Sequence, residues 1–135
     1  MDEKMDPYYT ERKFASAVKM IANADISERN KKIIMRFRDV CIRNNLSKAR
    51  TLKYMEKLKI IARDLDKDLD QAKKKDIERL VTIIQEKPHT AQTKKDYRII
   101  VKRFYKWLYG KDEIYPEEVR WIKTSIKNCN KRIPE

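Results

Sequence analysis

The side chains best suited to chemistry are the cations and aromatic rings of residues 90–110, TAQTKKDYRIIVKRFYKWLYG. At 3.6 residues per turn, a helix over this stretch has one apolar face that can anchor in a core. A second face combines cations with tyrosines, and such a face can contact the phosphates and base edges of nucleic acid. The apolar face holds Tyr97, Ile100, Val101, Phe104 and Leu108, and the basic face holds Lys95, Arg98, Lys102, Tyr105, Lys106 and Tyr109.

A second basic stretch follows Ser47, a residue type that caps helices, and predicts a helix over residues 48–63. Lys48 and Arg50 fall in its first turn, where each cation opposes the helix dipole at a cost of a few tenths of a kcal/mol. Two interpretations stay open at this point. The start of the helix faces phosphates, where backbone N–H groups and cations act together, or it is a solvated basic face.

Residues for catalysis or metal binding do not form a recognisable set. His89 is the only histidine, and no Cys, Asp or Glu accompanies it at ligand spacing. Cys41 and Cys129 are expected to be free, buried thiols. The acidic stretch 64–72, DLDKDLDQA, lacks the glycine and the closing glutamate of a calcium loop, so we expect a solvated turn that points away from DNA. The sequence predicts no active site, no metal site and no cofactor.

Composition narrows the class of partner. The 135 residues include 34 Lys or Arg and 21 Asp or Glu, which gives a formal charge of +13 and favours nucleic acid, an anionic membrane or an acidic protein. No run of 18 apolar residues could span a membrane, and the start lacks the order of a signal peptide, so we expect a cytoplasmic protein. Because the chain holds one glycine and four prolines, the sequence predicts an all-α fold.

Caps and breakers place the elements of a compact bundle of five to six helices. Thr10, Ser27, Ser47 and Thr90 are the predicted N-caps, and Gly110 is a natural residue to follow a helix end. The domain boundaries are predicted after residues 26 and 111, which gives segments 1–26, 27–111 and 112–135. The expected helices cover 11–23, 28–45, 48–63, 73–87 and 90–109, with a short one from Pro116 that carries Val119, Ile122, Ile126 and Cys129.

Two stretches resemble a known family. They are Leu46–Tyr54 followed by Leu58, and Tyr97–Gly110, with Asp76–Leu80 between them. Their order is similar to the SAM-like core-binding domain at the start of tyrosine recombinases, the phage-type and Xer-like integrases. Tyr115-Pro116 stands where many members have Asn-Pro. The resemblance covers about two-thirds of the chain.

The resemblance implies that the helices at 48–63 and 90–109 face the major groove of duplex DNA. It also implies that the catalytic set lies in a second domain beyond this chain, which is therefore not an enzyme by itself. The full parent protein would form a tetramer on DNA, and the isolated domain would be a monomer. The expected DNA contacts are Lys48, Arg50, Lys53, Lys57, Thr93, Lys94, Lys95, Arg98 and Lys102.

Two other functions remain open from the sequence. The basic faces could bind an acidic protein, as a helical interaction module with no role in recombination. They could also bind RNA through its shape. Duplex DNA is the leading partner because charge pattern and resemblance select the same two helices.

Overall fold

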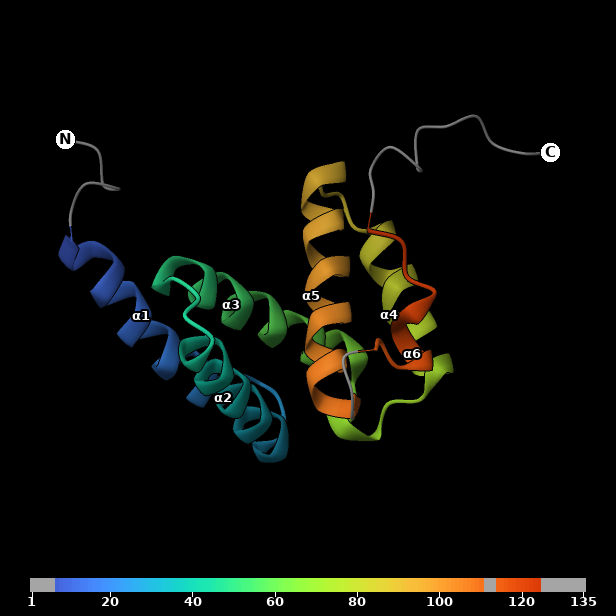
Figure 1. The fold of residues 1–135 in the computed structure, drawn as a ribbon, viewed down its shortest axis with the longest axis horizontal. Helices are drawn as coiled ribbons and strands as arrows, with labels where there is room; N and C mark the ends of the chain where they lie inside the picture. Colours follow the sequence, from blue (N-terminus) through green and yellow to red (C-terminus); the bar gives the residue numbers. More distant parts are fainter. Residues whose placement is uncertain (1–6, 111–113, 125–135) are drawn as a thin grey trace. The chain divides into compact units, whose positions relative to one another are not determined.

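The structure, a computed structural model, describes residues 7–110 and 114–124. Over these residues the fold is all-α, as the sequence predicts, with no strand. The described residues form six α-helices and one 3-10 turn (Figure 1). The helices are α1 (Pro7–Ala22), α2 (Glu28–Arg43), α3 (Lys48–Leu65), α4 (Lys74–Glu86), α5 (Ala91–Tyr109) and α6 (Glu117–Arg120), and the 3-10 turn is η2 (Leu69–Gln71).

The chain divides into two compact units, Met1–Leu69 and Asp70–Glu135. The first unit holds α1, α2 and α3, and the second holds α4, α5 and α6. This division differs from the predicted boundaries after residues 26 and 111, since α1 packs on α2 and α3 within the first unit. An independently folding domain over 27–111 stays a prediction.

The first unit is built around α3, whose apolar positions recur at three- and four-residue spacing and face both other helices. Ser27 and Ser47 cap α2 and α3 as predicted, each accepting a backbone N–H at 3.1 Å. The Phe37 and Tyr54 rings meet edge to face, with centroids 5.7 Å apart. The core comprises Phe14, Ala17, Ile21, Ile33, Ile34, Phe37, Cys41, Tyr54, Met55, Leu58, Ile61, Ala62, Leu65 and Leu69.

The acidic stretch 64–72 is more than the solvated turn that the sequence predicts. Helix α3 continues to Leu65 and ends where Asp66 adopts the left-handed conformation, with φ of 56°. Leu65 and Leu69 are both 0% exposed. The alternation of aspartate with leucine therefore turns two apolar side chains into the core while the aspartates stay at the surface or half-buried.

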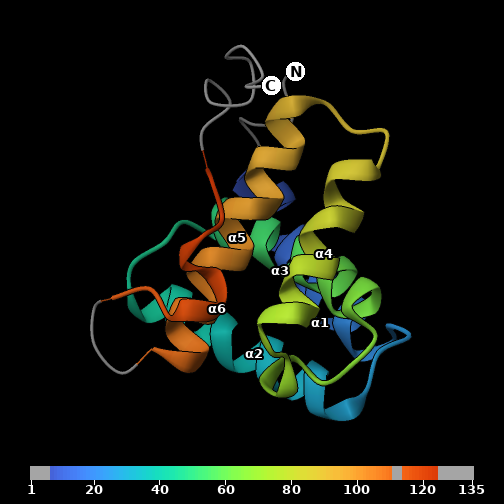
Figure 2. The same ribbon diagram turned by 90° about the vertical axis from the view of Figure 1, so that its right-hand side faces the viewer.

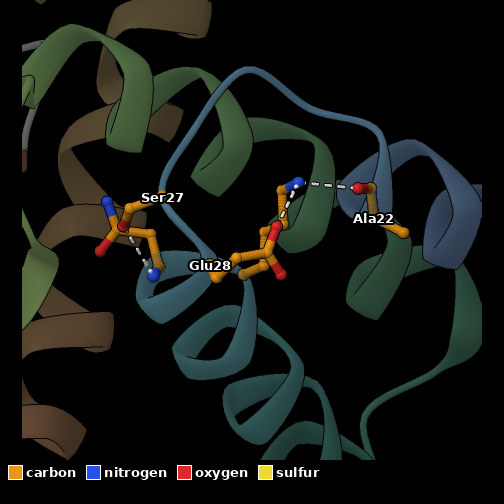
Figure 3. A network of polar contacts seen from close by, with 5 residues as sticks. Ala22, Ser27 and Glu28 are labelled. Atoms are coloured by element: carbon orange, nitrogen blue, oxygen red, sulfur yellow. Dashed lines mark hydrogen bonds and ion pairs between the residues drawn. The ribbon is translucent and has the colours of Figure 1, made fainter.

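Side chains at the start of α2 form hydrogen bonds to the segments that connect the helices of the first unit. The Asn30 amide donates to Lys67 O at 3.1 Å and accepts from the Leu69 N–H at 2.7 Å. Nearby, the Lys31 ammonium donates to Ala22 O at 2.8 Å and pairs with Glu28 (Figure 3). The Ser27 hydroxyl donates to Asp68. The bonds to Ala22 O, Lys67 O and the Leu69 N–H satisfy backbone groups at or next to helix ends, where groups otherwise lack partners.

In the second unit, α4, α5 and α6 lie side by side (Figure 2). Thr90 caps α5 as predicted, accepting the Thr93 N–H at 3.1 Å. Helix α5 ends at the predicted place, but Gly110 has φ of −75° and does not adopt the left-handed conformation expected of a residue after a helix end. The core comprises Ala72, Ile77, Leu80, Ile84, Tyr97, Ile100, Val101, Phe104, Tyr105, Val119 and Ile122.

The ends of the chain differ most from expectation. Helix α1 begins at Pro7, before the predicted cap at Thr10. Helix α6 has four residues, and Ile126 and Cys129 of its predicted apolar edge lie outside the described residues. Within 7–110 and 114–124, no helix has the length and apolar content needed to cross a membrane.

Candidate nucleic-acid interface

Three of the predicted DNA contacts align in one row along α3, beside its buried face. Arg50, Lys53 and Lys57 are spaced by three and four residues, so they lie on one side of the helix. Arg50 and Lys53 are exposed and Lys57 is half-buried. With a rise of about 1.5 Å per residue, the row is about 10 Å long, close to three nucleotide steps of about 3.4 Å. We call these three residues the α3 stripe.

The amino end of α3 adds donors beside the stripe. Ser47 uses its hydroxyl to accept the Arg50 N–H, and unpaired N–H groups of a first turn favour anions. Arg50 is also close enough to α2 to act on Cys41, a free and buried cysteine, as predicted. Burial raises the pKa of the Cys41 thiol, and the positive charge of Arg50 opposes that rise.

Lys48 does not belong to the α3 stripe, because it lies two residues before Arg50 and turns to another side of the helix. Its ammonium lies over the Phe14 ring of α1, 5.9 Å from the centroid. The Arg38 guanidinium of α2 lies 4.8 Å from the same centroid. Arg38 was not among the predicted contacts, since the sequence alone does not reveal that three helices bring these residues to one ring.

Arg98 does not fulfil its predicted role as an exposed DNA contact. Its side chain is buried, with the residue 5% exposed. Its Nε donates to Lys123 O at 2.8 Å, and a terminal nitrogen donates to the Gln85 side-chain oxygen. Arg98 therefore links α4 and the segment after α6 to α5, and it offers no cation at the surface.

Lys94 is also engaged within the second unit. Its ammonium donates to Gln85 O at 2.7 Å, near the end of α4. Helix α4 ends at Glu86 because Pro88 disfavours helix at the preceding residue. Its last carbonyls have no partner within the helix, so a cation placed there is stabilising. Lys94 was among the expected DNA contacts, and the sequence did not show this partner.

Lys102 and Lys106 lie one turn apart on α5, and one aromatic ring shields both. The Tyr115 ring centroid is 4.6 Å from the Lys102 ammonium and 4.9 Å from that of Lys106. Cation–π contacts near a protein surface contribute about 0.5–1 kcal/mol each, and more when the groups are desolvated. Arg120 holds the same residue from α6, donating from Nε to Tyr115 O at 3.2 Å.

Two apolar residues later in the same segment are held more strongly than the Tyr115 ring. Val119 is 0% exposed and Ile122 is 2% exposed. Burial of such side chains contributes about 1.5–3 kcal/mol each. Residues 119–122 are therefore firmly anchored in the second unit, whereas the Tyr115 ring depends on weaker contacts.

The remaining two predicted contacts lie in the first turns of α5. Thr93 accepts a hydrogen bond from the Thr90 hydroxyl at 3.1 Å, as part of the helix cap. Lys95 is half-buried. Among the nine predicted residues, the α3 stripe is thus the set that the structure aligns in one row, with two of its three cations exposed.

The described residues include no group of three or more His, Cys, Asp or Glu side chains that could hold a metal ion. His89 stacks on Tyr97, with centroids 5.7 Å apart. Burial raises the pKa of Tyr105 far above its ordinary value and, with nearby carboxylates, raises that of Tyr109 to about 12. Both phenols therefore stay protonated at neutral pH, and neither is an activated nucleophile.

Comparison with known proteins adds no relative: no family model, curated protein or solved structure matches the chain. The integrase resemblance therefore rests on the sequence stretches named above. The functional argument rests on the placement of cations in the structure.

Proposed function

We propose that this protein binds duplex DNA through the α3 stripe, as the core-binding half of a tyrosine recombinase. The observation that carries the proposal is the alignment of Arg50, Lys53 and Lys57 in one row beside the buried face of α3, with Arg50 and Lys53 exposed and Lys57 half-buried. A row of cations on a rigid helix can follow one strand of the phosphate backbone.

Charge and resemblance support the same partner. The formal charge of +13 attracts a polyanion from a distance, and the capped amino end of α3 places N–H groups beside the stripe. The stretch Leu46–Tyr54, which carries much of the resemblance to integrases, includes the start of α3. In this proposal, integration and recombination belong to a parent protein whose catalytic domain closes on the other side of the DNA.

The proposal predicts salt-dependent binding to a labelled duplex, measured by fluorescence anisotropy. If about four phosphates are neutralised, affinity falls roughly 100-fold between about 50 and 200 mM salt, because each contact releases condensed counterions. Binding that is indifferent to salt would contradict the proposal. Equal competition by duplex RNA would favour recognition of A-form shape instead, and preference for an acidic protein would favour an interaction module.

Charge reversal tests whether the α3 stripe makes the contact. The triple variant Arg50→Glu, Lys53→Glu, Lys57→Glu should weaken binding at least 100-fold and reduce the slope of log affinity against log salt by about three. The matched control reverses three exposed lysines elsewhere, with Lys19→Glu, Lys74→Glu and Lys75→Glu. It makes the same change in net charge. If both variants lose affinity equally, net charge alone accounts for binding and the stripe has no special role.

A further inference from the structure

We propose that the Tyr115 ring is a displaceable cover over a second phosphate site, formed by Lys102 and Lys106 of α5. The inference rests on the proposed function, since it assumes a phosphate-bearing partner. In the free protein, the ring lies 4.6 and 4.9 Å from the two ammonium groups. When a phosphate of the DNA backbone arrives, it takes the place of the ring.

The two lysines favour a single partner that contacts both of their ammonium groups. They are four residues apart on α5, a spacing at which like charges repel. The negative face of an aromatic ring offsets that repulsion by contacting both. A phosphate does so more strongly, because each ammonium donates a charge-assisted hydrogen bond to an anionic oxygen. The ring therefore stabilises the pair when the site is empty and yields when it is filled.

The contacts of the segment after α5 indicate which end of it can move. Tyr115 is half-buried, and the preceding residue, Ile114, is 65% exposed. Four residues later, Val119 is fully buried, and Arg98 binds Lys123 O from within the core. Because Arg120 also binds Tyr115 O, the movement in this proposal is that of the Tyr115 side chain. When the ring moves, the ammonium groups of Lys102 and Lys106 become available to a phosphate. The guanidinium of Arg98 remains buried and does not.

The experiment compares Tyr115→Ala with Tyr115→Phe, using a labelled duplex and, separately, inorganic polyphosphate as probes. Tyr115→Ala removes the competing ring and should tighten binding of both probes about 5-fold, the factor set by one to two lost cation–π contacts. Tyr115→Phe keeps the ring and should bind like the unchanged protein. Circular dichroism of both variants shows whether the fold is intact, and Tyr115→Leu repeats the test with an apolar side chain of similar bulk.

A second substitution identifies the site that the ring covers. Lys102→Gln should weaken binding several-fold more in the Tyr115→Ala background than in the unchanged protein, because there the ammonium meets the probe directly. Unchanged affinity of Tyr115→Ala and Tyr115→Leu for both probes would overturn the cover, as would equal tightening by Tyr115→Phe. A different result would show that the proposed function, and not the cover, is wrong. It would appear as salt-independent duplex binding by the unchanged protein, and polyphosphate would still test the cover.

Discussion

Each of the two units is held together by a buried polar side chain, but the two side chains differ in charge. In the first unit, the neutral amide of Asn30 binds Lys67 O and the Leu69 N–H. In the second, the guanidinium of Arg98 binds the Gln85 side chain and Lys123 O. Both tie a connecting segment to a helix, and both are among the buried polar residues of the described chain.

The two units also differ in how many predicted DNA contacts they use internally. In the first unit, Lys31 of α2 binds Ala22 O, while Arg50 and Lys53 of α3 are exposed and Lys57 is half-buried. The second unit uses cations for its own closure, with Arg98 in the core and Lys94 at the end of α4. Two helices with similar basic patterns therefore have different roles, and α3 is the stronger candidate for contact with DNA.

The largest expected effect is on the stability of the second unit. Arg98→Met removes hydrogen bonds to Gln85 and Lys123 and leaves their oxygens without those donors, which should lower the free energy of unfolding by about 2–4 kcal/mol. Urea unfolding followed by circular dichroism measures the change. Arg103→Met, at an exposed position of the same helix, is the control and should cost about 0.5 kcal/mol or less. A variant with unchanged stability but weakened DNA binding would restore Arg98 as a DNA contact.

The corresponding change in the first unit should be smaller. Asn30→Ala removes the two side-chain hydrogen bonds to Lys67 and Leu69. Because neither bond involves a charged group, we expect the free energy of unfolding to fall by about 1–3 kcal/mol. Asn23→Ala, at an exposed position, serves as the matched control in the same unfolding experiment. If Asn30→Ala destabilises the protein more than Arg98→Met, the distinction between a neutral and a charged closure is wrong.

Alkaline pH should weaken the second unit through Tyr109, a half-buried tyrosine. Desolvation, with the charges of Glu118 and Asp70, raises the pKa of Tyr109 from 10.0 to about 12. The folded form thus holds its proton at pH values where the unfolded chain loses it. Stability should therefore be fully present below about pH 10 and decline as pH rises toward about 12.

Urea unfolding across that pH range measures the alkaline decline. Tyr109→Phe removes the hydrogen bond to Ala72 O and should cost about 1 kcal/mol at neutral pH. It should also make the alkaline decline shallower, because one of the shifted phenols is gone. Identical pH profiles for the two proteins would show that Tyr109 does not contribute to the decline.

Much of the fold follows from local sequence. The caps at Ser27, Ser47 and Thr90 were predicted because a short hydroxyl side chain beside an apolar-periodic run satisfies the first N–H groups of a helix. Pro88 similarly fixed the end of α4. Buried stripes were predictable for the same reason, since three- and four-residue spacing places side chains on one face of a helix regardless of what that face packs against.

The sequence by itself determined the helices, their buried stripes and the location of positive charge along the chain. Tertiary structure decided which of those charges are used internally. Arg98 and Lys102 stand on one basic face of α5, yet their partners, Lys123 O and the Tyr115 ring, lie later in the chain. Helical periodicity gives the direction in which a side chain points from the axis of its helix. It carries no information about the distant carbonyl or ring that packing brings to that side.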